Sequence, residues 1–493
     1  MLYKSTRGKG KTVTASQAIV KGLAEDGGLY VPQEIPKLGR SLESLIDMNY
    51  RELAFYIMKM YFDDFSDEEL KACVDSAYDE KFENPLIAPL NYKAGVNFLE
   101  LYHGKTLAFK DMALSILPYL MKTAAKKSGI SKEIVILTAT SGDTGKAALE
   151  GFDSVEGTKI IVFYPKDGVS EIQRIQMAVQ EGKNTFVVGI DGNFDDAQSG
   201  VKELFADEEF NRLLGENGFM FSSANSINIG RLVPQIVYYV YSYAQLLKNG
   251  RISSGENINL VVPTGNFGNI LAAYYAKCMG IPVGRLICAS NKNKVLADFM
   301  NTGVYDRRRE FYITNSPSMD ILISSNLERF LYELSGRNAE IVSGLMDKLK
   351  NDGVYEINQH MKEGLQIVYG GFASEAETID AIREVYDSSN YVIDTHTAVA
   401  YVVYKNYKRE SGDGTATVIV STASPFKFPK SINEALHFAD SDSIEFEMVE
   451  ELSRKMNLKI PKGIQGLDKK EVLHKTTCSK DGMKDVIKSF LNI

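Results

Sequence analysis

The stretch IVILTATSGDTGKAALEGF (134–152) joins an apolar run, a glycine-containing turn and a helical pattern. The run is continuously apolar rather than alternating, which is typical of a strand buried on both faces of a parallel sheet. A helix begins with unpaired N–H groups and a positive dipole end, so a turn that leads into one predicts an anion-binding loop. A capped helix without a ligand is the alternative. The turn comprises Ser141, Gly142, Asp143, Thr144 and Gly145.

Similar apolar runs recur along the chain, and helical patterns lie between them. The runs occupy 159–165, 185–191, 259–265, 283–290 and 417–423. Strands that alternate with helices form βαβ units, so the chain from about residue 95 predicts an α/β fold with parallel sheets. Residues 1–90 carry capped amphipathic patterns, with Ser16 as one cap candidate, and predict a helical N-terminal domain. The tail from about 430 predicts helices or edge strands, whereas 291–390 predicts no definite elements.

Composition limits the classes of function. The chain has 493 residues, with 56 Lys and Arg against 64 Asp and Glu, a formal net charge of −8. About 150 residues per domain suggests about three domains. The acidic balance argues against nucleic acid as the main partner, because such binding uses basic surface. No apolar stretch reaches the roughly 18 residues of a membrane helix, and no signal peptide is evident, so we expect a cytoplasmic protein. Four separated cysteines and five histidines predict neither disulfides nor a metal site.

A second strand, glycine loop and helix lie in NLVVPTGNFGNILAAYYAK (259–277). Gly265 and Gly268 permit close approach of the backbone to an anion, and Asn266 and Asn269 are able to reach a ligand. Two such loops in one α/β body suggest either a ligand with two anionic groups or two ligands.

Three further segments carry polar groups with two interpretations each. Lys110, in LYHGKTLAFKDMALS (101–115), is either a lysine that extends toward solvent or a desolvated amine for Schiff-base chemistry. Arg231, in FSSANSINIGRLVPQIVYY (221–239), suits phosphate recognition or lies on the surface near a helix cap. The hydroxyls at the end of the run at 417–423 and directly after it either contact a ligand or satisfy nearby backbone groups; they belong to Ser421, Thr422 and Ser424.

Taken together, the motifs resemble the threonine synthase family, pyridoxal-phosphate enzymes of the tryptophan-synthase-β-like fold. The matching segments are YKSTRG (3–8), 17–36, HGKTLAFKD (103–111), TATSGDTGKAA (138–148), NSINIGRLVPQ (225–235), PTGNFGN (263–269) and, more loosely, STASPFKFP (421–429). The resemblance implies a fold-type II enzyme with two mostly parallel α/β domains and a helical N-terminal domain. We expect domain limits at 1–92, 93–430 and 431–493.

The resemblance also implies roles for single residues. Lys110 would form the aldimine with pyridoxal 5'-phosphate, Phe109 would lie against the cofactor ring, and Thr422 would hydrogen-bond the ring nitrogen. The cofactor phosphate would bind to Gly265, Asn266, Phe267, Gly268 and Asn269. The substrate carboxylate would bind to the loop of Ser141, Gly142, Asp143, Thr144 and Gly145. The substrate phosphate would bind to Thr144, Ser226, Arg231 and Asn266, with Asn225 and Asn228 as lesser candidates.

The implied activity converts O-phospho-L-homoserine and water to L-threonine and phosphate. A phospho-lyase that releases 2-oxobutyrate and a non-catalytic binding protein are the alternatives, and the chain is expected to be a monomer or a homodimer. Four positions differ from the pattern seen in relatives. Lys105 replaces a common proline and is expected to face solvent, and Ser424 and Phe426 replace His and Ala. Asp143 stands where many relatives of this fold have asparagine, but the longer threonine synthases also carry aspartate, so the resemblance makes it a character of that subgroup. Its carboxylate is costly unless it is hydrogen-bonded or turned away.

Overall fold

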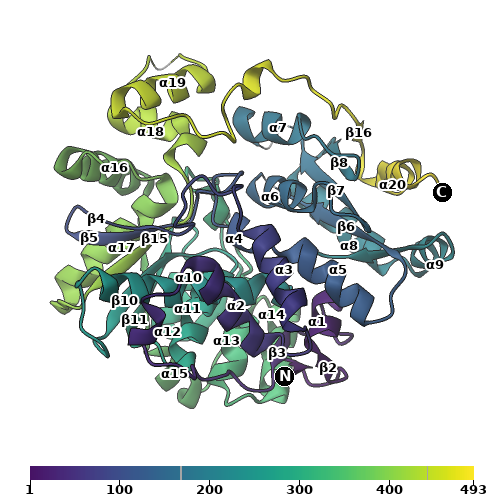
Figure 1. Ribbon diagram of the computed structural model, residues 1–493, viewed down its shortest axis with the longest axis horizontal. Coiled ribbons are helices and arrows are strands. Elements are labelled where there is room, and N and C mark those ends of the chain that lie inside the picture. Colours follow the sequence, from purple (N-terminus) through teal and green to yellow (C-terminus); the bar gives the residue numbers. More distant parts are fainter. Residues whose placement is uncertain (141, 167–168, 441) are drawn as a thin grey trace.

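The computed structural model describes residues 1–140, 142–166, 169–440 and 442–493. Two sheets lie beside each other, each with helices on both faces (Figure 1). The large sheet has six strands in the order β14-β11-β10-β15-β5-β4, and the small sheet has five in the order β16-β8-β7-β6-β9. The chain leaves the large sheet after β5, builds β6 to β9, and returns to the large sheet at β10.

The large sheet is parallel except for its edge strand β4. Leu260 and Val262 belong to the apolar cluster that holds residues of α10, α11 and α13, whereas Val261 between them packs with α16 and α17. The continuously apolar run therefore is a strand buried on both faces, as predicted. The elements are β4 (Leu90–Lys93), β5 (Val96–Glu100), β10 (Ile258–Pro263), β11 (Val283–Ser290), β14 (Val368–Phe372), β15 (Thr417–Ser421), α10 (Ile229–Lys248), α11 (Gly268–Met279), α13 (Leu327–Leu334), α16 (Glu375–Ser389) and α17 (Thr395–Ser411).

All pairings within the small sheet are parallel. Val135 and Leu137 pack against α8, α9 and α20, while Ile134 and Ile136 face the main core on the opposite side. The elements are β6 (Glu133–Ala139), β7 (Thr158–Pro165), β8 (Thr185–Ile190), β9 (Phe219–Ser222), β16 (Thr477–Cys478), α5 (Leu117–Lys127), α6 (Asp143–Phe152), α7 (Glu171–Ala178), α8 (Phe194–Ala206), α9 (Glu208–Glu216) and α20 (Met483–Leu491). The prediction of two mostly parallel sheets is confirmed.

The N-terminal part is mixed rather than helical. Three short strands, β1 (Leu2–Ser5), β2 (Val13–Thr14) and β3 (Tyr30–Pro32), form an antiparallel sheet beside α1 (Ala15–Lys21), α2 (Tyr50–Tyr61) and α3 (Asp67–Ala77). Strands of two to four residues are too short to show a period in the sequence. The expected cap Ser16 is wrong: Thr14 caps α1 through a reciprocal capping box with Gln17, and Ser16 is buried within the helix.

The segment that gave no sequence prediction contains short helices, a two-stranded sheet and the 3₁₀ turn Pro317–Met319. Besides α13, β14 and α16, its elements are α12 (Val295–Thr302), β12 (Val304–Asp306), α14 (Ala339–Asn351), β13 (Val354–Glu356) and α15 (Gln359–Leu365). The tail forms α18 (Pro429–Leu436), α19 (Glu445–Met456), the edge strand β16 and α20, as predicted. Within the described part of the chain, no helix combines the length and apolar character needed to cross a membrane.

Candidate active site

Lys110 lies where the carboxyl ends of β5 and β15 meet. Backbone bonds fix its segment to the end of β15: the Phe109 N–H donates to the Thr422 carbonyl at 2.7 Å, and the Ser424 N–H donates to the Leu107 carbonyl at 3.0 Å. Lys110 is followed at once by the short helix α4 (Asp111–Leu114). Ligands of open α/β sheets bind beyond such strand ends, so the position suits a reactive group.

Asp111 holds the loop before Lys110 in shape. Its carboxylate accepts the Thr106 N–H at 2.8 Å and the Thr106 hydroxyl at 2.6 Å. The side chain lies so close to Gly104 that a Cβ there would be 2.5 Å from Oδ2, which explains the glycine of the HGKT segment. Burial raises the pKa of Asp111 to about 6. Lys105 turns away to Glu150 at 3.1 Å, in line with the expectation that it faces outward.

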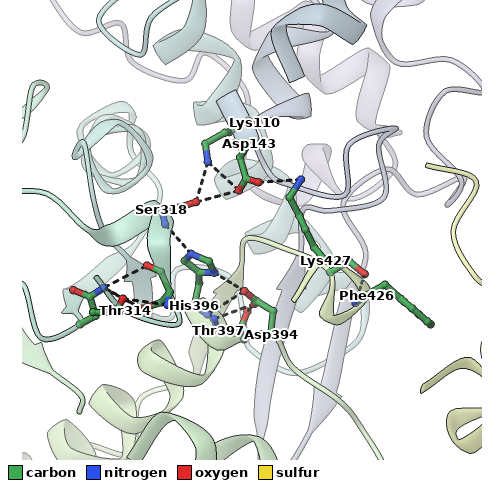
Figure 2. Close-up of polar contacts among 12 residues, drawn as sticks. Lys110, Asp143, Thr314, Ser318, Asp394, His396, Thr397, Phe426 and Lys427 are labelled. Carbon is green, nitrogen blue, oxygen red and sulfur yellow. Dashed lines mark hydrogen bonds and ion pairs between the residues drawn. The ribbon is translucent and has the colours of Figure 1, made fainter. Parts of the chain in front are cut away.

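The Lys110 amine is buried and has two polar neighbours. Its Nζ is 3.3 Å from Asp143 Oδ2 and 3.1 Å from Ser318 Oγ (Figure 2), and 5.5 Å from the centre of the Phe109 ring. Burial lowers the pKa of Lys110, and the nearby charge of Lys427 adds to this effect, against the opposing influence of Asp143. The amine therefore loses its proton more readily than an ordinary lysine.

Both oxygens of the buried Asp143 carboxylate have polar or charged partners. Lys427 Nζ is 3.0 Å from its Oδ1, which Gln173 also reaches at 2.9 Å, and the Ser318 hydroxyl donates to Oδ2 at 3.0 Å. Burial alone would raise the pKa of Asp143, but the charges of Lys427 and Lys110 outweigh burial and hold that pKa far below its usual value. These hydrogen bonds and ion pairs compensate for the burial of the carboxylate at position 143, where many relatives of the fold have asparagine.

The loop from β10 to α11 has features of an anion cradle. Phe267 starts α11 with a left-handed backbone (φ 63°), and a Cβ on Gly265 would be 2.5 Å from the Ser318 carbonyl, so the loop is tightly packed. Asn269 Oδ1 accepts the hydroxyls of Tyr238 and Tyr239, while its buried Nδ2 has no partner among the described residues. This unpaired donor lies at the first turn of a 12-residue helix, where an anion is favoured.

The segment between β9 and α10 forms another loop, and it places Arg231 at the start of α10. Its Nη1 donates to the Ala224 carbonyl at 2.9 Å, and its buried Nε has no partner in the described part of the chain. Burial lowers the pKa of Arg231 to about 10. A buried guanidinium with an unused donor is costly by itself, so it suits an anionic ligand.

Asn326 joins the two loops. Its Nδ2 donates to the Ser226 carbonyl at 3.2 Å and to the Asn266 carbonyl at 3.1 Å. Its Oδ1 accepts Nη1 of Arg329, which also donates to the carbonyls of Tyr30 and Ile227. A buried arginine thus connects the N-terminal sheet to both anion loops. Burial lowers the pKa of Arg329 to about 10.

Several residues expected at the substrate loops have other contacts. Asn228 is buried as the cap of α10: it accepts the Gly230 N–H and donates to the carbonyls of Ile19 and Ser223. Asn225 is exposed, and the Ser226 hydroxyl has two long contacts of 3.4 Å, one to Ser325 Oγ and one from Asn326 Nδ2. Asn228 therefore stabilises the start of α10, whereas Ser226 is half-buried and lies in the same segment as Arg231.

Two backbone N–H groups of the loop between β6 and α6 are hydrogen-bonded to a side chain of the same segment. The N–H groups of Gly142 and Gly145 donate to Thr140 Oγ1 at 3.0 and 2.9 Å. Thr144 is half-buried in the first turn of α6, and Ser141 lies outside the described residues. Ser424 caps the 3₁₀ turn Pro425–Lys427, and Phe426 is buried in an apolar cluster, so their departure from the family pattern is structural here.

The structure adds residues that the sequence did not single out. These are Gln173, Ser318, Asn326, Lys427 and the pair Asp394 and His396. His396 Nε2 accepts the Ser318 N–H at 3.2 Å, and its Nδ1 is 2.7 Å from Asp394 (Figure 2). Of these residues, Lys427 alone had a signal in the sequence, because it is a lysine within the apolar segment SPFKFP (424–429). The sequence does not reveal the others, because distant segments bring them together.

Comparison with known proteins agrees with this arrangement. Three family models match the chain: threonine synthase N terminus over 2–78, pyridoxal-phosphate dependent enzyme over 85–423, and threonine synthase, C-terminal, over 397–476. Threonine synthase of Schizosaccharomyces pombe is 39% identical over 469 residues, 88% of this chain and 89% of that protein. The crystal structure of pyridoxal-phosphate-bound threonine synthase from Brucella melitensis has a TM-score of 0.87 and 34% identity, and covers 100% of this chain and 98% of that chain.

Threonine synthase-like 1 of Pongo abelii is 41% identical over 434 residues, which are 85% of this chain, and the match spans 58% of that longer protein. Fold and site together define a fold-type II, pyridoxal-phosphate-dependent enzyme. Within that class, the chain belongs to the threonine synthase family, whose cofactor is pyridoxal phosphate. The predictions of family, cofactor and α/β fold are confirmed.

Proposed function

We propose that this chain is a threonine synthase, which converts O-phospho-L-homoserine and water to L-threonine and phosphate. The observation that supports it most is the pair of anion loops bridged by Asn326, one with the unpaired Asn269 Nδ2 and the other with the unpaired Arg231 Nε. Two phosphates must bind in this reaction, one from the cofactor and one from the substrate. The buried Lys110 amine provides the proton-transfer group.

The residues fit pyridoxal phosphate. Its phosphate would bind at the start of α11, to the N–H groups of 265–269 and to Asn269 Nδ2. Lys110 offers the amine, Phe109 the ring contact, and Thr422 a neutral partner for the ring nitrogen. When bound, the cofactor supplies an aldehyde that reacts with amines and a ring that withdraws electrons from the substrate carbons.

Lys110 would move the protons. A lysine with a lowered pKa is able to accept a proton near neutral pH and return it later. We infer that its amine removes the proton at Cα and then assists proton removal at Cβ. Phosphate then leaves Cγ, a proton is returned to Cγ, water adds at Cβ, and a proton is returned to Cα. Ser318 and Asp143 hold Nζ in place through contacts of 3.1 and 3.3 Å.

The substrate's charged ends would bind to two different elements. Arg231 and Ser226 would hold its phosphate, with Asn266 and Thr144 nearby. The loop 141–145 would hold its carboxylate at the first turn of α6, where the dipole favours an anion. This arrangement orients Cα and Cβ toward Lys110.

The test is a product assay with purified protein and O-phospho-L-homoserine. Threonine should form in equal amount to phosphate. Release of 2-oxobutyrate and ammonia with phosphate would instead identify a phospho-lyase on the same scaffold, a distinction of interest because threonine synthase-like 1 proteins are among the relatives. No phosphate release by protein loaded with cofactor would support a binding protein.

A further inference from the structure

Lys427 is a second buried lysine that the proposed reaction does not use. Its side chain has no exposed surface, and it enters from the 3₁₀ turn Pro425–Lys427 just after β15. Its Nζ is 3.0 Å from Asp143 Oδ1 and donates to the Thr106 carbonyl at 2.7 Å. Lys110 approaches the other oxygen of the same carboxylate at 3.3 Å (Figure 2). One carboxylate therefore lies between two ammonium groups.

The other charged and titratable groups around this cluster come from several elements. Arg231 at the start of α10 and His396 on α17, which is paired with Asp394, influence Lys110 and Asp143 respectively. The charge of Lys427 also lowers the pKa values of Asp111 and Lys146, although burial has the larger effect on both. Gln173 and Ser318 are the uncharged partners of Asp143. Among the residues that the structure describes, Asp143 is thus the carboxylate that pairs with both lysines.

Lys110 changes charge in the proposed role, because its amine must be free of its proton to act as a base. If Lys110 were the sole counter-ion of Asp143, each loss of that charge would leave a buried carboxylate unpaired. An unpaired buried charge is strongly unfavourable. The second ion pair, at 3.0 Å, and the bond to Thr106 keep a cation beside Asp143 in both states of Lys110.

We propose that Lys427 is the permanent counter-ion of Asp143, and that it lets Lys110 lose its charge while the buried carboxylate stays paired. Lys427 acts through Asp143 and is a positioning residue. The inference rests on the proposed role of Lys110 as a proton-transfer group.

The test compares Lys427→Met, which removes the charge, with Lys427→Arg, which keeps it. The pH at which the Lys110 amine becomes reactive is measured on the full-length, cofactor-free protein by competitive acetylation and mass spectrometry, with the exposed Lys122 as an internal standard. We expect Lys427→Met to raise this midpoint by about one pH unit or more, since one cation fewer opposes the Lys110 charge. Lys427→Arg should shift it much less. An unchanged or lowered midpoint in Lys427→Met would overturn the proposal.

A second measurement covers the case in which Lys427→Met does not fold. The double variant Asp143→Asn/Lys427→Met removes the carboxylate together with its counter-ion, and should recover stability in urea unfolding relative to Lys427→Met alone. Failure of Asp143→Asn to restore any stability would show that Lys427 acts through other contacts, and would also overturn the proposal.

This test is independent of the substrate. A protein that makes no threonine but shows the shifted midpoint would refute the proposed function and leave the counter-ion role intact. Normal threonine formation with an unshifted midpoint would refute only the role of Lys427.

Discussion

His396 accepts the backbone N–H of Ser318 through Nε2 at 3.2 Å. Because Nε2 is the acceptor, the ring proton lies on Nδ1, which is 2.7 Å from the Asp394 carboxylate. The hydroxyl of Ser318 in turn contacts both Lys110 and Asp143. A buried imidazole thus fixes the residue that touches the Lys110 amine, although it does not itself reach that amine.

Replacing His396 should affect catalysis more than substrate binding. His396→Leu leaves the Ser318 N–H and the Asp394 carboxylate without this partner, so we expect a loss of about 1–3 kcal/mol in the free energy of unfolding. We also expect kcat to fall while KM changes little, because Ser318 is no longer held beside Lys110. Ser318→Ala, which keeps the backbone N–H, should lower kcat without the loss of stability. Equal urea midpoints for His396→Leu and the parent protein would contradict this view.

Lys110→Ala should abolish turnover. Loss of a positioned acid–base group typically costs about 10²–10⁴-fold, and here the same side chain also attaches the cofactor, so we expect at least the upper end. The visible absorbance of the bound cofactor should become removable by dialysis. Lys105→Ala is the matched control: Lys105 pairs with Glu150 and points away, so activity should persist. Substantial threonine formation by Lys110→Ala would refute its assigned role.

Gly265→Ala should weaken cofactor binding. The new Cβ would lie 2.5 Å from the Ser318 carbonyl, so either the loop before α11 or the turn carrying Ser318 must move. Equilibrium dialysis should show a higher dissociation constant for pyridoxal phosphate. Gly344→Ala, in the middle of α14 with no atom within 4 Å of the new Cβ, should leave affinity unchanged and add up to about 0.5–1 kcal/mol of stability. Similar dissociation constants for both variants would show that the loop tolerates the displacement.

Arg329→Met should loosen both anion loops at once. It removes three hydrogen bonds, to Tyr30, Asn326 and Ile227, and leaves buried acceptors unpaired, so we expect a loss of about 3 kcal/mol or more in urea unfolding. Affinity for pyridoxal phosphate should fall as Asn326 loses its anchor. Arg337→Met cuts a different link to the N-terminal strands, through Pro32, and should leave cofactor affinity unchanged. Unchanged affinity in Arg329→Met would show that Arg329 does not hold the anion loops in place.

Asp111 should make stability depend on pH. Its native pKa of about 6 lies above the ordinary 3.8, so the native state binds more protons between these values, and this contribution to stability is lost as pH rises from about 4 to about 6. At 1.36 kcal/mol per pH unit, the loss amounts to about 3 kcal/mol. Asp111→Asn lacks this dependence, so its free energy of unfolding relative to the parent should improve over that range. A constant difference from pH 4 to pH 7 would show that burial of Asp111 has no such cost.

The sequence predicted the local features of the site and missed most of the long-range ones. Continuous apolar runs located the strands, and the glycine turns after them located the loops at 141–145 and 265–269, because these signals depend on neighbouring residues. Ser318 and His396 reach the site only through tertiary packing, and the segment of Ser318 showed no clear period. The sequence indicates Asn228 as a lesser ligand candidate, because a helix cap and a phosphate-binding asparagine have the same sequence pattern. The domain limits after 92 and 430 stay predictions.

The path of the chain between the two sheets has a mechanical consequence. The segment 101–132 leads from β5 to β6 and carries Lys110, and the segment 223–257 leads from β9 back to β10 and carries Ser226 and Arg231. Four of the five strands of the small sheet thus form an insertion into the large sheet, and the fifth, β16, comes from the C-terminal tail. The two segments that connect the insertion carry the residues proposed for proton transfer and for phosphate binding. A rotation of this unit toward the large sheet would turn the lysine segment and the phosphate segment together. Closure around a ligand and alignment of the reacting groups would then be a single movement, rather than two successive ones.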